Sequence, residues 1–255
     1  MSDSIRVLPK GYTDTPFLPG SKWRIHDIDR PEPSIVGPGT YSTQESLGSP
    51  PSDAIVLFDG TSLDEWESVR GGEVKWALTK GRAVTVQGGT GDIRSRREFG
   101  TCQLHVEWSA PTDIKADSQG RGNSGVFLMG LYEIQVLDSY ENPTYADGHA
   151  GAIYGQFPPL ANAMSPPGEW NVFDIVFEAP EYQANELVSP ATMTLFHNGV
   201  LAHLRQTMQG PTKHRELASY ATPHGPKGPV VLQDHSDPVR FRNIWIRELE
   251  RVESV

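Results

Sequence analysis

Cysteine and long apolar segments are almost absent from this sequence of 255 residues. Cys102 is the only cysteine, so the chain cannot form an internal disulfide. Nowhere do about 18 apolar residues follow one another, as a membrane-spanning helix would require. Residues 1–10 also lack the basic and apolar parts of an export signal. We therefore expect a soluble chain, cytoplasmic as written and periplasmic or secreted if a signal has been removed.

Positive charge is also scarce. The chain has 22 Lys and Arg against 32 Asp and Glu, which gives a formal net charge of −10. Because nucleic-acid recognition depends on neutralising phosphates with Lys and Arg, we expect no nucleic-acid partner. The lack of a long apolar segment argues against a membrane partner. A neutral small molecule such as a sugar suits this composition better.

Glycine and proline are abundant instead, with 25 and 21 residues. Short apolar runs separated by turn residues recur along the chain, and no long amphipathic helix is evident, which favours an all-β sandwich. Apolar and polar residues alternate over residues 102–108, as in a half-buried strand. Asn198-Gly199 stands between two strand-like runs and predicts a two-residue turn with positive φ. At this length one sandwich domain with long loops is expected.

The first 53 residues differ from the rest in composition, because prolines at eight positions interrupt any regular element. Phe17 and Trp23 are aromatic anchors of a kind that free linkers seldom carry. We therefore expect residues 1–53 to form an extended arm packed on the sandwich, and residues 54–255 to form the sandwich itself.

A hairpin predicted over residues 123–139 carries polar groups where a plain core strand would carry none. Side chains alternate between the two faces of a strand, so Glu133 and Gln135 should point away from the core. Asp138 would fall on the core face, where an unpaired carboxylate is costly, unless a bulge or turn after Gln135 returns it beside Glu133. In the alternative interpretation, Glu133 and Asp138 are a solvated strand face and a turn cap.

The spacing Glu133-x-Gln-x-x-Asp138 resembles the bulged Glu-x-Asp-x-x-Glu strand of retaining β-glucan hydrolases, which fold as jelly-roll sandwiches. Two carboxylates that flank a sugar suit acid and base catalysis at a glycosidic bond. Here Gln135 occupies the central position, where it can only form hydrogen bonds.

A wider set of motifs, spread over residues 54–249, resembles one bacterial family, the proteins with a 3-keto-disaccharide hydrolase domain. These domains are also described as 3-keto-glucoside lyase and hydratase domains. Eight motifs in the same order carry the resemblance: Leu57-Phe-Asp-Gly with Trp66, Asn123-Ser-Gly-Val-Phe127, Tyr132-Glu-Ile-Gln-Val-Leu-Asp138, Gly151-Ala-Ile-Tyr154, Trp170-Asn171, His197-Asn-Gly199, Gln233-Asp-His235 and Val239-Arg-Phe-Arg-Asn-Ile-Trp245.

The resemblance implies a concanavalin A-like jelly-roll sandwich and cleavage of a glycoside whose sugar is oxidised at C3. A ketone at C3 acidifies the hydrogen on C2, so a modest base can remove it and the C1 oxygen can leave. Water can then add to the enone. Such a reaction needs a base near C2, an acid near the leaving oxygen and donors at the enolate oxygen.

Candidate roles follow from the chemistry of each side chain. The expected catalytic residues are Glu133, Asp138, His235 and His149. The expected substrate-binding residues are Asn123, Gln135, Tyr154, Trp170, Asn171, Gln233 and Arg242. Purely structural roles stay open: loop hydrogen bonding for His235 and His149, core packing for Trp170 and Tyr154, and pairing with a surface acid for Arg242.

A divalent cation such as Ca²⁺ or Mg²⁺ is a further hypothesis, with Glu133, Asp138 and Asp234 as its ligands, because hard cations take several oxygen ligands. No organic cofactor is expected. Two other functions remain open at this point. The chain could be a lectin-like carbohydrate-binding module without turnover, or a conventional retaining β-glucan hydrolase whose two carboxyl groups lie about 5–5.5 Å apart.

Overall fold

The computed structural model describes residues 10–79 and 82–250, and these fall into two compact units, residues 10–37 with 250 and residues 38–249. In the first unit, short β-bridges join Phe17 to Arg24 and Tyr12 to Asp27. The boundary expected at residue 53 lies inside the second unit, because residues 38–53 pack with the strands that follow. Packing of residues 10–37 on the sandwich stays a prediction, and residues 1–9 and 251–255 lie outside the described residues.

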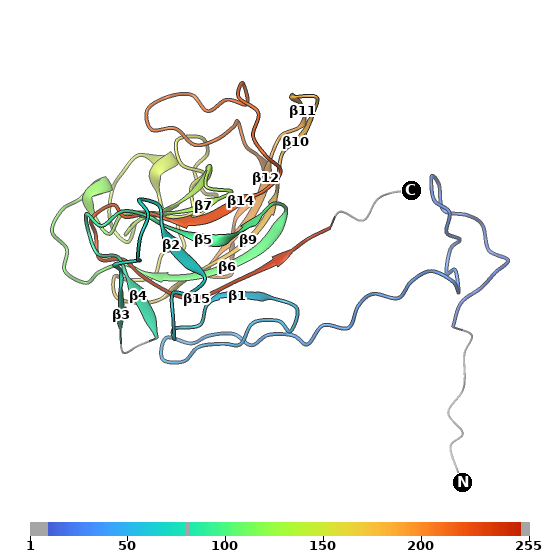
Figure 1. Cartoon of the computed structure of the whole chain (residues 1–255), viewed down its shortest axis with the longest axis horizontal. Coiled ribbons are helices and arrows are strands. Elements are labelled where there is room, and N and C mark those ends of the chain that lie inside the picture. The colour runs from blue at the N-terminus through green and yellow to red at the C-terminus, as the bar shows by residue number, and fades with distance from the viewer. Residues whose placement is uncertain (1–9, 80–81, 251–255) are drawn as a thin grey trace, which may run out of the picture. The chain divides into compact units, whose positions relative to one another are not determined.

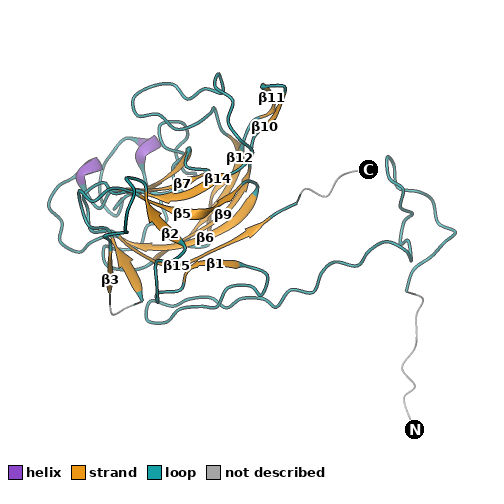
Figure 2. Ribbon diagram, viewed as in Figure 1, coloured by secondary structure: helices purple, strands orange, loops and turns teal. Residues whose placement is uncertain are grey.

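The second unit is built from two antiparallel sheets that face each other as a jelly-roll sandwich (Figures 1 and 2). The larger sheet has the order β13-β12-β9-β6-β15-β4-β3, with β1 beside β15. Its strands are β1 (Ile55–Phe58), β3 (Ala77–Thr79), β4 (Ala83–Thr85), β6 (Cys102–Ser109), β9 (Asn171–Glu178), β12 (Thr192–His197), β13 (Val200–Thr207) and β15 (Arg240–Glu248). The all-β expectation is confirmed.

The smaller sheet has the order β2-β5-β14-β7-β8 and carries the hairpin predicted over residues 123–139. Its strands are β2 (Trp66–Ser68), β5 (Ile93–Phe99), β7 (Ser124–Leu128), β8 (Tyr132–Val136) and β14 (Gly228–Leu232). A separate ribbon and two 3₁₀ turns complete the described elements: β10 (Glu181–Gln183), β11 (Glu186–Ser189), η1 (Ser118–Gly120) and η2 (Ala146–Gly148). No helix of the described residues is long and apolar enough to cross a membrane.

The core lies between the two sheets, where apolar side chains from alternate strand positions meet. Leu104, Val106 and Trp108 of β6 are fully buried there, as the alternation over residues 102–108 predicts. The predicted turn at Asn198-Gly199 is confirmed as well, since their φ angles are 50° and 76° and the turn joins β12 to β13. Local periodicity and turn chemistry were therefore sufficient to place these elements.

Glu107 lies on the opposite face of β6 and is also fully buried. Residues 42–48 form a strap that covers this outer face of the larger sheet, and the side chain of Ser42 donates a hydrogen bond to Glu107. Arg242 of β15 reaches the same strap through the backbone carbonyl of Thr43, at 2.6 Å. The polar face of β6 is thus covered by the chain itself.

Candidate active site

A pocket of about 390 Å³ lies on the face of the smaller sheet that points away from the core. Its floor is formed by β7 and β8, which pair so that Phe127 lies opposite Glu133 and Gly125 opposite Gln135. Tyr132, Ile134 and Val136 are fully buried in the core, so the alternation predicted for this strand is confirmed. The described residues that line the pocket are Gln119, Asn123, Phe127, Glu133, Gln135, Tyr145, Tyr154, Thr212, His214, Gln233 and His235.

Glu133 is the acidic residue of this lining. Its side chain is only 5% exposed, and its carboxyl has no hydrogen bond or ion pair to any described residue. Burial and, to a smaller degree, the charge of Asp92 raise the pKa of Glu133 to about 8. A side chain on Gly125 would come within 2.7 Å of Oε1 of Glu133, so glycine at this position leaves the carboxyl its space.

Two long loops hold the backbone of Glu133 in place, although β8 is the last strand of its sheet. The hydroxyl of Thr212 accepts a hydrogen bond from the N–H of Glu133 at 2.9 Å. The N–H of Tyr154 donates to the carbonyl of Glu133 at 3.3 Å. Because strand and loops share backbone contacts, the carboxyl projects from a fixed position.

A chain of amides beside Glu133 orients the remaining floor. The amide nitrogen of Gln135 donates to Oε1 of Gln119 at 3.0 Å and to Oδ1 of Asn123 at 3.3 Å. Both N–H groups of Gln135 therefore have protein partners, and its carbonyl oxygen is left as an acceptor. The side-chain amide of Gln233 makes no hydrogen bond within the part of the chain that the structure describes, so its donors face the pocket unpaired.

An aromatic wall closes one side of the pocket. The hydroxyl of Tyr154 lies 2.9 Å from the hydroxyl of Tyr145 and 3.1 Å from Nδ1 of His214. The rings of Tyr154 and His214 are stacked, with an interplanar angle of 11°. Burial and the hydrogen bond with Tyr145 raise the pKa of Tyr154, so its hydroxyl keeps its proton.

The structure brings together six of the residues singled out in the sequence: Asn123, Glu133, Gln135, Tyr154, Gln233 and His235. His235 is exposed at the pocket wall and its ring has no hydrogen bond to a described residue. The other singled-out residues lie outside the lining.

Asp138 is not returned to the side of Glu133. Its carboxylate is fully buried and accepts a hydrogen bond from Nε of Arg121 at 2.6 Å and from the N–H of Tyr140 at 3.1 Å. The unpaired carboxylate that a bulge was invoked to avoid is instead neutralised by an arginine from the preceding loop. Asp138 therefore anchors the turn after β8.

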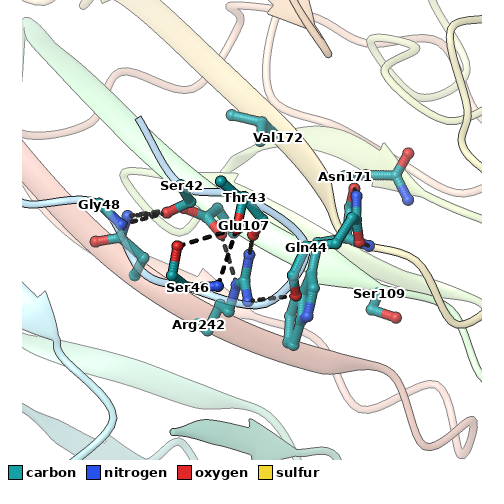
Figure 3. Close-up of polar contacts among 12 residues, drawn as sticks. Ser42, Thr43, Gln44, Ser46, Gly48, Glu107, Ser109, Asn171, Val172 and Arg242 are labelled. Carbon is teal, nitrogen blue, oxygen red and sulfur yellow. Dashed lines mark hydrogen bonds and ion pairs between the residues drawn. The ribbon is translucent and has the colours of Figure 1, made fainter. Parts of the chain in front are cut away.

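Arg242 of β15 and Asn171 of β9 lie on the larger sheet (Figure 3), and Trp170 immediately precedes β9. None of the three belongs to the described lining of the pocket. Arg242 pairs with Glu107 at 2.6 Å, and its guanidinium stacks on the ring of Trp170 at 4.1 Å. Asn171 is fully buried and its side-chain oxygen accepts hydrogen bonds from the backbone of Ser165 and the side chain of Asn198. The polar side-chain groups of Arg242 and Asn171 are engaged by the protein itself, and the ring of Trp170 packs on Arg242.

His149 also lies outside the lining, and its Nδ1 is buried without a hydrogen-bond partner among the described residues. Asp234 accepts hydrogen bonds from the backbone of Gly91 and Ser236. Because Asp138 is paired with Arg121, the three carboxylates considered as cation ligands do not form one donor set. Over residues 10–79 and 82–250, no group of three or more His, Cys, Asp or Glu side chains is placed to hold a metal ion.

Five lining residues were missed in the sequence: Gln119, Phe127, Tyr145, Thr212 and His214. The period of two along β7 places Phe127 on the same face as Asn123, so this residue could have been found from alternation. Thr212 and His214 come from a loop almost eighty residues beyond Glu133, and no local pattern marks them.

Comparison with known proteins agrees with the fold. A family model described as a 3-keto-alpha-glucoside-1,2-lyase-like domain matches residues 53–247. A 3-keto-disaccharide hydrolase from Bacteroides thetaiotaomicron is 24% identical over 235 residues, which cover 77% of this chain and 78% of that protein.

Two solved structures from Parabacteroides distasonis, both described as candidate glycosyl hydrolases, have a similar fold. The first is 44% identical with a TM-score of 0.83, over 95% of this chain and 100% of that one. The second is 19% identical with a TM-score of 0.56, over 78% of this chain and 94% of that one, and shows the fold alone.

Proposed function

The chain belongs to the 3-keto-alpha-glucoside-1,2-lyase-like family, and on this premise we propose that it is a glycosyl hydrolase-type enzyme that cleaves 3-keto-glycosides. The name of the relative from Bacteroides thetaiotaomicron, a 3-keto-disaccharide hydrolase, supports the substrate class. The absence of Lys and Arg from the described lining of the pocket also suits an uncharged sugar.

One observation carries the proposal: Glu133 is a buried carboxyl without a partner in a pocket of sugar size. A pKa of about 8 makes its carboxylate a stronger base than an ordinary glutamate, and the best catalytic bases have pKa values near the working pH. The C2 hydrogen beside a ketone is an acid that such a base can remove. A fully solvated carboxylate would be less suited to this task.

The reaction proceeds in two balanced stages. In the first, the Glu133 carboxylate takes the C2 proton, the C1–O bond breaks, and the leaving oxygen receives a proton from an acid in the pocket. In the second, water adds its oxygen to C1 of the enone, its proton returns to the acid, and Glu133 gives its proton back to C2. The sum is 3-keto-glycoside plus water giving 3-keto-sugar plus alcohol, without a covalent sugar-enzyme intermediate.

Other polar side chains of the pocket would bind the substrate and protonate the leaving oxygen. The unpaired amide of Gln233 and the hydroxyl hydrogen of Thr212 are the donors available to the enolate oxygen at C3, where they would stabilise the developing charge. Gln135 offers its carbonyl oxygen to a sugar hydroxyl. The acid at the leaving oxygen is one of the two lining histidines, His214 or His235, since imidazole is suited to proton transfer near neutral pH.

The two other functions receive less support. A retaining β-glucan hydrolase needs a second carboxyl group about 5–5.5 Å from the first, whereas Glu133 is the only carboxyl of the described lining and Asp138 pairs with Arg121. A lectin-like module would bind sugar through the same amides and tyrosines, but it has no use for a desolvated carboxyl without a partner, which costs stability.

The test is to incubate the protein with 3-keto-trehalose and with ordinary trehalose, with and without a chelator, and to measure the sugars released. We expect 3-ketoglucose from the first substrate only, and release by Glu133→Gln that is slower by about 10²–10⁴-fold. A Glu67→Gln variant, which changes an exposed ion pair with Arg94 on the same sheet, is the matched control and should keep full activity. Sugar binding without any cleavage of 3-keto-trehalose would support the lectin-like module instead.

A further inference from the structure

Three side-chain amides, those of Gln119, Asn123 and Gln135, form a relay of hydrogen bonds across the floor of the pocket. Gln119 belongs to η1, Asn123 immediately precedes β7, and Gln135 lies on β8. An amide can present either its oxygen or its nitrogen to a neighbour. The partners of the three amides decide which way each one lies, and this polarity determines what the floor offers to a ligand.

Backbone carbonyls, which can only accept hydrogen bonds, fix both ends of the relay. The amide nitrogen of Gln119 donates to the carbonyl of Gly148 at 3.0 Å and to the hydroxyl of Thr144 at 2.8 Å. The amide nitrogen of Asn123 donates to the backbone carbonyl of Gln119 at 2.7 Å. The side-chain oxygens of Gln119 and Asn123 are therefore the atoms that face Gln135.

Gln135 cannot turn its amide, because its nitrogen already donates to both of these oxygens, Oε1 of Gln119 and Oδ1 of Asn123. A turned amide would place a third oxygen against them at a position where Gln135 is only 1% exposed, and buried acceptors without donors are costly. Its main chain is held as well, by the N–H of Gly151 at 2.8 Å and the carbonyl of Ala152 at 3.0 Å. Oε1 of Gln135 is thus a fixed acceptor in the lining of the pocket.

This acceptor lies two residues along β8 from Glu133, on the same face of the strand, with the two Cα atoms about 6.6 Å apart. When C2 of a 3-keto ring lies at the Glu133 carboxylate, C3 carries a carbonyl oxygen and C1 carries the leaving oxygen, and neither has a hydrogen to donate. The 2-hydroxyl is the donor at the reacting carbon. An acceptor that cannot turn pairs with this hydroxyl and repels the ketone, which leaves the ketone to the donors of Gln233 and Thr212.

We propose that Gln135 selects 3-keto-glycosides with a free 2-hydroxyl, and that Gln119 and Asn123 are positioning residues that hold Gln135 in its accepting orientation. This inference rests on the function proposed above and adds which hydroxyl of the ring the floor recognises. A 2-hydroxyl that is absent or substituted leaves Oε1 of Gln135 buried without a donor, and sites built to bind a hydroxyl discriminate against analogues that lack it.

The experiment changes the protein and the substrate in turn. It measures kcat/KM for 3-keto-trehalose and for the analogue that lacks the 2-hydroxyl of the keto ring. Because loss of this hydroxyl also alters the intrinsic reactivity of C1 and C2, the quantity to follow is how the ratio of the two kcat/KM values changes between protein variants. Gln135→Met keeps the approximate volume of the side chain and removes the acceptor, so the preference for the hydroxylated substrate should fall about 10-fold.

Gln119→Leu tests the positioning role and leaves Gln135 itself unchanged. It removes one of the two oxygens that hold the Gln135 nitrogen, so we expect the preference for the hydroxylated substrate to fall about 3-fold. If Gln119 only stabilised the fold, both substrates would lose activity equally and the ratio would stay the same. Gln206→Leu is the matched control, since the Gln206 amide donates to the carbonyl of Thr207 on the larger sheet, and it should leave the ratio unchanged.

The same ratio in Gln135→Met as in the unchanged protein would overturn the assignment of Gln135 to the 2-hydroxyl and leave the proposed function intact. A ratio that falls in Gln135→Met but not in Gln119→Leu would overturn the positioning role of Gln119. If Gln135→Met does not fold, an unchanged ratio in Gln119→Leu, at a half-buried position, overturns the inference. If the unchanged protein cleaves neither substrate, the proposed function fails and this inference fails with it.

Discussion

Two buried glutamates, Glu107 and Glu133, lie on the two sheets of the same sandwich and have opposite surroundings. Glu107 accepts hydrogen bonds from Arg242, Asn243 and Ser42, and it lies 3.2 Å from Nε2 of His105. Although burial favours its neutral form, these hydrogen bonds and the charge of Arg242 lower the pKa of Glu107. Glu133 has no such partners, and its pKa is raised to about 8.

We propose that this difference separates a structural charge, Glu107, from a reactive one, Glu133. A buried charge that is fully paired holds elements together, here the strap over residues 42–48 and strands β6 and β15 (Figure 3). A buried carboxyl left without partners is costly, and perturbed groups of this kind gather where chemistry occurs. Burial alone does not distinguish the two, so the hydrogen-bond partners must be counted.

The largest expected effect is on catalysis. Glu133→Gln should lower kcat/KM for 3-keto-trehalose by about 10²–10⁴-fold, because the amide cannot accept the C2 proton. The thermal midpoint should stay the same or rise, since the change removes an unpaired buried acid. Steady-state kinetics and thermal unfolding of the same preparation measure both. Equal activity in the variant would mean that Glu133 is not the base.

For Glu107 we expect a loss of stability and no loss of activity. Glu107→Ala should lower the free energy of unfolding by about 3–5 kcal/mol, because it leaves Arg242 buried without its partner. Chemical denaturation measures this loss. Activity per folded molecule should not change, since the strap is not part of the pocket.

The double variant Glu107→Ala/Arg242→Met separates loss of the ion pair from loss of packing. It removes both charges and should recover part of the stability that Glu107→Ala loses. The control is Arg242→Met alone. If Arg242→Met lowers the free energy of unfolding as much in the Glu107→Ala variant as in the unchanged protein, the two residues are not coupled, contrary to what their 2.6 Å contact implies.

Glu133 and Glu107 should contribute to the pH dependence of stability in opposite directions. Glu133 binds its proton more tightly in the folded state than in the unfolded state, where its pKa is near the ordinary 4.5. Above that pH the unfolded state releases the proton first, so this group lowers stability as pH rises from about 4.5 to about 8. The slope is at most about 1.4 kcal/mol per pH unit.

Glu133→Gln should remove this slope, which urea titrations at a series of pH values can measure. Glu107 acts in the other direction, because its lowered pKa contributes stability above the ordinary value that is lost as pH falls through the folded value. Activity should rise with pH towards about 8 as the Glu133 carboxylate forms. A rate that falls over this range would assign Glu133 the role of an acid.

The smallest expected effect concerns the aromatic wall of the pocket, formed by Tyr145, Tyr154 and His214. Tyr154→Phe removes the hydroxyl that links Tyr145 and His214 and should lower kcat/KM by about 10-fold, since each lost hydrogen bond contributes about 0.5–1.5 kcal/mol. Tyr145→Phe, which changes a more exposed ring and leaves the contact with His214, should have a smaller effect. The comparison of the two variants in one assay tests whether orientation of His214 matters.

Structural features that depend on residues close together in the chain could be predicted from the sequence alone. Strand alternation placed Glu133 and Gln135 on one face of β8, and Asn198-Gly199 predicted the hairpin between β12 and β13, because side-chain period and turn geometry are set within a few residues. Ordered motifs likewise indicated the family. The pocket floor was therefore predictable before any coordinates.

Which charges were paired was decided only by tertiary contacts. Arg121 neutralises Asp138, and Arg242 and Glu107 neutralise each other beneath the strap of residues 42–48. A loop remote in sequence brings Thr212 and His214 to Glu133. Such pairings depend on how distant loops close over the sheets, and no local period encodes loop closure. Asp138 and Glu133, five residues apart, thus received opposite environments from segments that strand alternation could not place.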